Sequence, residues 1–501
     1  MKPLELGGTP LALEEVSEVV FLKRKVLLSE NAIQKIKKSQ AYLLSEVQSG
    51  KTIYGVNTGF GLLSNVKIEN HKIEELQYRL IRSHAVGVGN YLEDKYVRAI
   101  LLLRANALAL GYSGVSLGLI EQLIAFLNHE ISPLIPEQGS VGASGDLAPL
   151  AHLALVLIGE GRARVSGKEC TGAEALRKAE LKPLKLGPKE GLALVNGTQF
   201  MTGLGTLALL DAEYLCNMAS YSGAMSVEAL RGSTGPFESE IHEVRAHPGQ
   251  VRAAKHLRTL LGSGSEIAKS HKTCTKVQDP YSLRCIPQVH GASWDVLQYV
   301  RSILEREINS VTDNPIVFSE KKKILSGGNF HGQTIAMAMD FLAIAVAEIA
   351  SISEQRIEKL MNPVISELPA FLAPEGGLNS GFMIVQVAAA SLVSENKTLC
   401  HPASVDSIPT SADKEDHVSM GAWAARKALQ VVTNSRRVLA MEFLSAAQGI
   451  DFLRPLRSTA EIEKIHAKIR SKIPKLEQDR SMHEDLLCME DLLREQKLDV
   501  G

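Results

Sequence analysis

Long helical patterns, several of them without a polar face, constrain the fold of this chain more than any other feature. Four such patterns cover residues 290–313, 330–360, 380–396 and 417–447. Asn314-Pro315 ends the first pattern, and Gly449 ends the last. Several are rich in alanine and apolar nearly all round, and a helix of that kind must be covered on every side. The sequence therefore predicts a tight bundle of near-parallel helices that other subunits complete.

The composition leaves a small molecule as the default ligand. The 55 lysines and arginines nearly cancel the 56 aspartates and glutamates, so no overall charge favours nucleic acid or an anionic membrane. The most hydrophobic stretch, residues 335–352, contains Asp340 and Glu348, and we expect it to fall short of a membrane span. The start of the chain lacks a signal-peptide core and the six cysteines lack C-x-x-C spacing. Both features favour reduced thiols and a cytoplasmic location.

The strongest local signal is a loop of small residues, GSVGASGD at positions 139–146. Three glycines and two serines in eight residues cannot sustain a regular element, whereas the apolar run at 147–159 reads as a buried helix capped by Asp146. The spacing fits neither G-x-S-x-G, which needs one more residue, nor a phosphate loop, which needs a following Lys-Ser/Thr. A strained loop should therefore lead into a helix N-terminus.

Self-modification fits the triad Ala143-Ser144-Gly145 within this loop. Ser144 can lose water to give a dehydroalanine, and the amide nitrogen of Gly145 can close onto the carbonyl of Ala143. Glycine has no Cβ to block that bend. An ordinary capped turn is the alternative interpretation of the same residues.

With this triad, and with YGVNTGFG at positions 54–61, the chain resembles the aromatic amino acid ammonia-lyase family over nearly its whole length. The Ala-Ser-Gly triad of that family makes the electrophile 4-methylidene-imidazole-5-one (MIO). The resemblance implies that Ala143, Ser144 and Gly145 form MIO autocatalytically and that no external cofactor is needed. It also implies a catalytic role for Tyr54, which can act as a base if surrounding donors lower the pKa of its hydroxyl.

Two positions of the resemblance concern substrate choice. Ser83-His84 stands where family members acting on histidine carry Ser-His, whereas tyrosine lyases typically carry His-Leu and phenylalanine lyases Phe-Leu. Glu415 matches a catalytic glutamate that faces the imidazole in the histidine-specific members. Asp413-Lys414 departs from the usual Asn-Gln, which puts the outer hydrogen bonds of Glu415 in doubt. Because we expect Glu415 at a helix N-terminus, helix capping is its alternative role.

The remaining site residues are also assigned by resemblance. Asn196 is expected to contact MIO and the substrate carboxylate, and Phe330 is expected to line the site. Tyr281 and Arg284 are three residues apart, so a helical turn would point both side chains the same way. A guanidinium beside a phenol suits an amino acid carboxylate, and we expect Tyr281 to be catalytic. Gln278 is included with Arg284 among the substrate-binding residues.

The resemblance implies an aspartase/fumarase-like helical architecture. The predicted fold class is mainly α, an elongated bundle of long helices with a smaller N-terminal active-site domain. We place the N-terminal domain, with the MIO and Tyr54 loops, at residues 1–190 and the helical bundle with a C-terminal helical layer at residues 191–501. The polar stretch at 262–279 is a candidate mobile lid. Hairpins are expected at 162–172 and between Asn314-Pro315 and Gly328.

The activity that the resemblance implies is non-oxidative removal of ammonia from L-histidine, which leaves trans-urocanate and is the first step of histidine degradation. An electrophile that bonds the amine improves a poor leaving group, and a base removes the weakly acidic β-proton. The family implies a homotetramer with sites shared between subunits. No metal site is expected, since His-Glu-x-x-His is absent. The alternatives are a tyrosine or phenylalanine ammonia-lyase or aminomutase, and a non-catalytic helical scaffold.

Overall fold

The computed structural model of the chain describes residues 1–272 and 277–498, which form two compact units. Unit 1 combines Met1–Leu207 with Arg301–Asp340 and Pro402–Arg426, and unit 2 combines Ala208–Val300 with Phe341–His401 and Lys427–Gly501. The sequence predicts a single cut after residue 190. The observed units are not divided by a single cut, because the segments Arg301–Asp340 and Pro402–Arg426 belong to unit 1.

Unit 1 is built from short helices around one buried helix. The helices wholly inside it are α1 (Leu13–Phe21), α2 (Glu30–Gln48), α3 (Ile73–His84), α4 (Asp94–Ala109), α5 (Leu117–Asn128), α6 (Leu147–Leu157), α7 (Gly172–Lys178) and α8 (Glu190–Val195). In α4 every residue from Val97 to Ala109 is buried, and α1, α2 and α5 pack against it. The loop-bearing helix α6 packs against α3 and α8. The core of unit 1 thus supports the loop at residues 139–146.

Short strands join the helices of unit 1. β1 (Leu4–Leu6) pairs with β2 (Val26–Leu28), β3 (Val88–Tyr91) with β5 (Pro136–Gln138), and β8 (Ile316–Phe318) with β9 (Lys323–Leu325). A three-stranded sheet has the order β4 (Ile131–Pro133), β6 (Arg162–Val165), β7 (Lys168–Thr171). Among these strands of the described residues, β1 and β2 run parallel and the other pairs are antiparallel. Both predicted hairpins are confirmed as β6–β7 and β8–β9. Ser166 and Gly167 have φ of +52° and +75°, as a tight two-residue turn requires.

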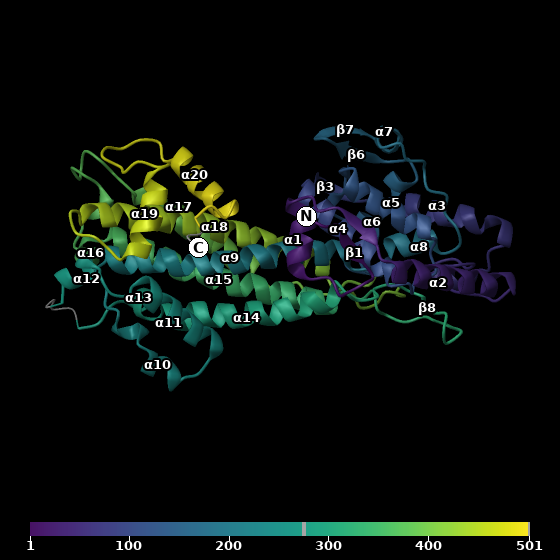
Figure 1. Cartoon of the computed structure of the whole chain (residues 1–501), viewed down its shortest axis with the longest axis horizontal. Coiled ribbons are helices and arrows are strands. Elements are labelled where there is room, and N and C mark those ends of the chain that lie inside the picture. Colours follow the sequence, from purple (N-terminus) through teal and green to yellow (C-terminus); the bar gives the residue numbers. More distant parts are fainter. Residues whose placement is uncertain (273–276, 499–501) are drawn as a thin grey trace. The chain divides into compact units, whose positions relative to one another are not determined.

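The prediction of a mainly helical fold is confirmed (Figure 1). The long helices are α9 (Gln199–Ala229), α14 (Ile286–Glu307), α15 (Gln333–Met361), α17 (Met383–Leu399) and α18 (Gly421–Phe452). Shorter helices of unit 2 are α10 (Ser239–Glu243), α11 (Pro248–Leu260), α12 (Glu266–Ser270), α13 (Tyr281–Arg284), α16 (Pro363–Ser366), α19 (Ala460–Arg470) and α20 (His483–Arg494). The last long helix begins four residues later than expected, because Met420 has φ +55°, which a right-handed helix cannot include.

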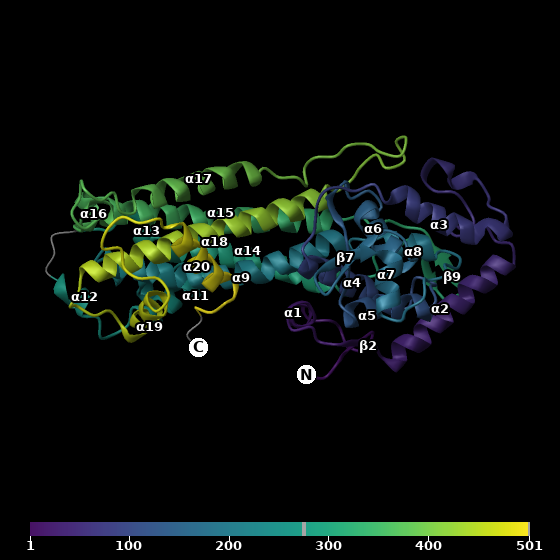
Figure 2. The same ribbon diagram turned by 90° about the horizontal axis from the view of Figure 1, so that it is seen from above.

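A buried carboxylate ties three of the long helices together inside unit 2, where α9, α15 and α18 lie side by side in both views (Figures 1 and 2). Glu442 on α18 accepts hydrogen bonds from Ser222 and Ser226 on α9 at 2.8 and 2.7 Å. From α15 it accepts bonds from Ser353 at 2.7 Å and from Arg356 at 2.5 and 2.8 Å. Arg356 and Glu442 are both 0% exposed. Such a fully bonded ion pair fixes the register of the three helices.

Helix α15 is the one helix among the described residues that is long and apolar enough to cross a membrane by length and composition. Its most apolar 18-residue window has a mean hydropathy of 2.0. The sequence expectation, that Asp340 and Glu348 keep this stretch short of a membrane span, is therefore not met by length and composition alone. Yet 67% of that window is buried inside the protein. A central helix of a folded core has the same character.

All five cysteines among the described residues carry free thiols, and Cys274 lies outside the described residues. Burial raises the pKa of the Cys216 thiol to about 12, although the charge of Arg252 opposes the shift. Cys216 therefore stays protonated at neutral pH, and a protonated thiol is a poor nucleophile.

Replacing Glu442 by alanine is expected to leave Arg356 as a buried charge without its carboxylate. Loss of one partner of a buried ion pair costs about 3–5 kcal/mol, so Glu442→Ala should lower the midpoint of thermal unfolding markedly. Glu75→Ala is the control, because Glu75 forms an exposed pair with Arg79 on α3 that contributes little. Calorimetry that gave equal midpoints for the two variants would contradict the role of the network.

Candidate active site

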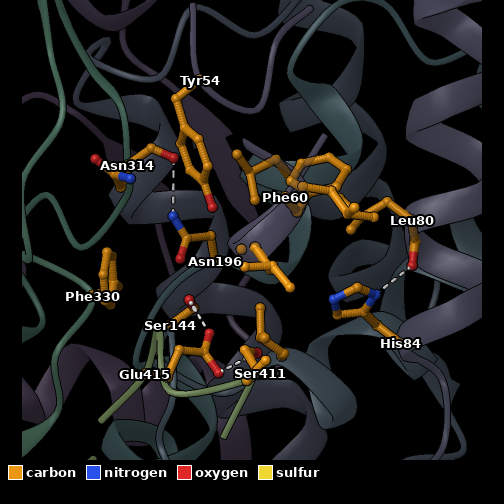
Figure 3. Close-up of a pocket in the computed structure, with 16 residues that line it drawn as sticks. Tyr54, Phe60, Leu80, His84, Ser144, Asn196, Asn314, Phe330, Ser411 and Glu415 are labelled. Carbon is orange, nitrogen blue, oxygen red and sulfur yellow. Dashed lines mark hydrogen bonds between the residues drawn. The ribbon is translucent and has the colours of Figure 1, made fainter. Parts of the chain in front are cut away.

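A cavity of about 510 Å³ in unit 1 gathers most of the site residues expected from the sequence (Figure 3). The expected residues that line it are Tyr54, His84, Ser144, Asn196, Phe330 and Glu415. Apolar side chains of Phe60, Leu80, Leu147 and Leu192 fill much of the remaining wall. Among the described residues that line it, none is a lysine or an arginine. The described lining residues therefore offer polar groups and one carboxylate.

The reactive triad lies on a sharply bent segment of the wall. Ser144 and Gly145 have φ of +52° and +80°, so the backbone is left-handed at two consecutive positions. Gly145 pairs with Gly197 as an isolated parallel bridge, and a Cβ on Gly145 would lie 2.2 Å from the Gly197 carbonyl oxygen. Only glycine tolerates that approach. The bend, the small neighbours and the exposure of Ser144 to the cavity suit cyclisation of Ala143-Ser144-Gly145.

Asp146 occupies the N-cap position of α6, but its side chain does not cap that helix. Its carboxylate instead accepts hydrogen bonds from the backbone N–H of Met201 at 3.0 Å and from Ser140 Oγ at 3.4 Å. The expected capping role is therefore wrong: the carboxylate satisfies the first turn of α9, where unpaired N–H groups point toward it. Burial raises the pKa of Asp146 to about 7, although these hydrogen bonds oppose the shift.

Glu415 faces the triad and caps no helix. Its Oε1 accepts a hydrogen bond from Ser144 Oγ at 3.1 Å, and its Oε2 accepts from Thr410 Oγ1 at 2.8 Å and Ser411 Oγ at 2.7 Å. The expectation that Glu415 lies at a helix N-terminus is wrong, since the next helix, α18, begins only at Gly421. Thr410 and Ser411 provide the outer hydrogen bonds, so the unusual Asp413-Lys414 pair is not required for them.

His84 ends α3 and turns its ring into the cavity (Figure 3). Its Nδ1 lies 2.8 Å from the carbonyl oxygen of Leu80 and 3.0 Å from Ser83 Oγ. A carbonyl oxygen only accepts, so the bond to Leu80 places the proton on Nδ1 and leaves the lone pair on Nε2. Burial lowers the pKa of His84, while the Leu80 carbonyl and the charge of Glu415 oppose the shift. A neutral His84 with an acceptor facing the cavity follows.

Tyr54 lines the same cavity as His84. Its ring lies at 84° to the Phe60 ring, with 6.5 Å between the two ring centroids. Burial raises the pKa of the Tyr54 phenol, the backbone N–H of Gly61 opposes the shift, and the charge of Glu415 raises the pKa further. The condition under which Tyr54 is expected to act as a base, a lowered pKa, is therefore not met by the described residues alone. Burial is the main cause, and the described lining residues add one negative charge and no positive one.

Asn196 follows α8 and joins two parts of the wall. Its Nδ2 donates to the carbonyl oxygen of Asn314 at 3.0 Å and lies 3.4 Å from Asp313 Oδ1. Its Oδ1 is buried and has no hydrogen-bond partner among the described residues. A buried acceptor without a partner is costly, so this oxygen suits an N–H group of a bound molecule. Phe330 forms the wall on the far side of Asn196 from His84 (Figure 3).

Gln278, Tyr281 and Arg284 do not line this cavity; they belong to unit 2. The expected helical turn is confirmed as α13, with the Arg284 guanidinium 4.5 Å from the centre of the Tyr281 ring. Gln278 and Arg284 line another cavity, of about 350 Å³, and Tyr281 is 70% exposed. The candidate lid at 262–279 includes residues 273–276, which lie outside the described residues.

Sequence reasoning missed three residues that shape the cavity. Asn314 holds Asn196, but its position before a proline indicates only the end of a helix. Thr410 and Ser411 hold Glu415, and their hydroxyls carry no recognisable motif. Only the proximity of Ser411 to Glu415 in the chain could have suggested such a contact.

The chain is similar to known proteins over its full length. Residues 11–471 match the model of a family described as aromatic amino acid lyase. A histidine ammonia-lyase of Anaeromyxobacter sp. (strain K) is 52% identical over 509 residues, covering 100% of both chains. The crystal structure of histidine ammonia-lyase from Trypanosoma cruzi has a TM-score of 0.92 and 45% identity, covering 99% of this chain and 94% of that one. Tyrosine aminomutase from Streptomyces globisporus has a TM-score of 0.93 and 39% identity, covering 99% and 97%.

Asp146 gives the stability of the protein a distinct pH dependence. Its folded pKa of about 7 lies above the ordinary value of 3.8, so the folded state keeps a proton that the unfolded state releases between those values. The stabilisation is complete below about pH 4 and is lost as the pH rises toward 7, by up to about 1.4 kcal/mol per pH unit.

Asp146→Asn removes this titration. Urea unfolding between pH 5 and 7 should therefore show a shallower fall in the free energy of unfolding for the variant than for the unsubstituted protein. Comparison of slopes cancels any constant loss caused by the amide. Parallel slopes would contradict a raised pKa at Asp146.

Proposed function

Because the chain belongs to the aromatic amino acid lyase family, we propose that it is a histidine ammonia-lyase, which converts L-histidine to trans-urocanate and ammonia in the first step of histidine degradation. The observation that carries this proposal is the placement of His84 and Glu415 on one cavity with Ser144. A carboxylate and a neutral imidazole offer two acceptors to an imidazole substrate, which carries a ring N–H.

The residues of the triad suit MIO as the resident electrophile, with no external cofactor. Two consecutive left-handed residues and the Gly145–Gly197 approach support closure of the Gly145 amide nitrogen onto the Ala143 carbonyl carbon. The carbonyl oxygen of Ala143 leaves as one water and the hydroxyl of Ser144 as a second. MIO supplies an electrophilic carbon that turns the amine of the substrate into a better leaving group. The protein positions the substrate beside it and moves the β-proton.

Glu415 and His84 would bind the substrate ring. Glu415 Oε1, which accepts from Ser144 Oγ at 3.1 Å in the unmodified triad, becomes available to a ring N–H once that hydroxyl is lost. His84 Nε2 is a second acceptor. Asn196 Oδ1 lacks a partner and suits the N–H of an ammonium group. These contacts orient the β-carbon toward Tyr54, the proposed base.

Tyr54 needs a nearby positive charge, and so does the substrate carboxylate. We propose that Arg284, with Tyr281 and Gln278, comes from another subunit of a cytoplasmic homotetramer. The exposure of Tyr281 and the absence of lysine and arginine among the described lining residues support this proposal. A guanidinium would pair with the carboxylate and lower the pKa of Tyr54, reversing the effect of burial.

A tyrosine or phenylalanine lyase or aminomutase is the second candidate, favoured by the structural likeness to a tyrosine aminomutase. Glu415 argues against the phenylalanine-specific enzymes, since a phenyl ring would leave Oε1 of this carboxylate without a donor after loss of the Ser144 hydroxyl. A non-catalytic scaffold would not require the strained triad.

Replacing Glu415 by glutamine should reduce kcat for L-histidine by about 100-fold, because the amide is a weaker acceptor for the ring N–H. Size-exclusion chromatography should show unchanged assembly. Asp413→Asn is the matched control in the same exposed loop and should keep kcat within about threefold, since Asp413 lines no part of the cavity. Equal turnover of both variants would assign Glu415 a structural role only.

Shared sites predict complementation between two inactive variants. Ser144→Ala removes the triad hydroxyl and Arg284→Met removes the cation, so each homomeric enzyme should lose turnover. Random assembly of the two chains should restore about a quarter of the sites, because an intact triad then meets an intact arginine from a neighbour. Coexpression with two affinity tags followed by an activity assay measures this recovery. Mixed tetramers without activity would contradict the shared site.

A further inference from the structure

We infer that Arg104 is a positioning residue for the active-site cavity: its buried guanidinium fixes the segment that carries Asn196 and supports the reactive triad. This inference rests on the proposed function. Arg104 does not line the cavity and would touch neither substrate nor electrophile. It acts through the backbone between α8 and α9.

The guanidinium spans the connection between these two helices. Arg104 lies on α4 and is 0% exposed. One terminal nitrogen, Nη2, donates to the carbonyl oxygen of Ala193, and the other, Nη1, donates to Gln199 Oε1 at 2.7 Å. These acceptors lie three residues before and three residues after Asn196. A rigid planar fork thus fixes both ends of the segment that holds Asn196.

The same guanidinium packs directly against Gly197. A Cβ on Gly197 would lie 2.3 Å from Arg104 Nη1, so no larger residue fits without moving the arginine or the backbone. The carbonyl oxygen of Gly197 accepts the N–H of Asp146 at 2.7 Å and closely approaches Gly145. A displacement of Gly197 would therefore also displace Gly145 and the triad to which it belongs.

Buried charge adds to this mechanical role. Arg104 and Lys189 are both completely buried beside a single close carboxylate, that of Asp313, which pairs with Lys189 at 2.5 Å. Burial lowers the pKa of Arg104 to about 10, so it remains charged at neutral pH. Its hydrogen bonds to Ala193 and Gln199 are therefore charge-assisted, which strengthens its hold on the segment that carries Asn196.

The chain offers a closely matched control in Arg98. It lies on the same helix, is also buried, and donates to the carbonyl oxygens of Leu127 and Val19 at 3.1 and 2.8 Å. Arg98→Met and Arg104→Met each remove a buried guanidinium from α4, so both should lower the thermal midpoint. Only Arg104 reaches the segment that holds Asn196.

The test compares both variants at a temperature where each is folded. Misplacement of catalytic groups by about 1 Å costs on the order of 100-fold, so we expect that loss of kcat in Arg104→Met but a change within about threefold in Arg98→Met. Intact-protein mass spectrometry of the same samples reports water loss from the triad. We expect incomplete water loss in Arg104→Met and full loss in Arg98→Met. Equal kcat and equal water loss in the two variants would overturn the inference.

Two further variants separate positioning from charge and from failure to fold. Arg104→Lys keeps the charge but cannot span both acceptors, so it should stay impaired; full activity in this variant would overturn the positioning role. Gly197→Ala displaces the same contact from the other side and should reproduce the defect if Arg104→Met does not fold. Unsubstituted protein that loses water from the triad but does not convert L-histidine would refute the proposed substrate while leaving the positioning test intact.

Discussion

The close approach of Gly145 to Gly197 is the contact on which the site depends. It brings the loop before α6 against the connection between α8 and α9, with no room for a side chain on either glycine. The hydrogen bond from Asp146 N to Gly197 O, at 2.7 Å, holds the two segments in register. The triad and Asn196 come from opposite sides of this contact, so their relative placement follows from it. The buried guanidinium of Arg104, from α4, packs against Gly197 at this contact.

Much of the fold follows from local sequence. Ser29 caps α2 by accepting the N–H of Ala32 at 3.1 Å, a role that serine favours at helix N-termini. The β8–β9 hairpin pairs Ile316 with Leu325 as its apolar runs predict. The long helices were equally visible, because a helical pattern sustained over many turns outweighs errors at its ends. Tertiary contacts decided those ends, as in the loop before α18.

The site was only partly predictable, for physical reasons. The family motifs pointed to Tyr54, Ser144 and Glu415, which line one cavity, but a motif does not state which hydrogen bonds form. Glu415 was open to a capping role because acids favour helix N-termini, and the left-handed backbone at Met420 moves that terminus away. The pKa of Tyr54 depends on the balance between burial and charges from distant parts of the sequence. No local pattern encodes that balance.

The chemistry links these features. In the function that we propose, a strained loop of small residues provides the electrophile, Glu415 and His84 bind the substrate ring, and Arg284 comes from a neighbouring subunit. The most direct measurement follows the ultraviolet absorbance of urocanate when purified protein, without added cofactor, receives L-histidine, with L-tyrosine and L-phenylalanine in parallel. We expect urocanate from L-histidine and no product from the other two. Coumarate or cinnamate without urocanate would contradict the selectivity assigned to His84 and Glu415, and no product from any substrate would contradict the lyase activity itself.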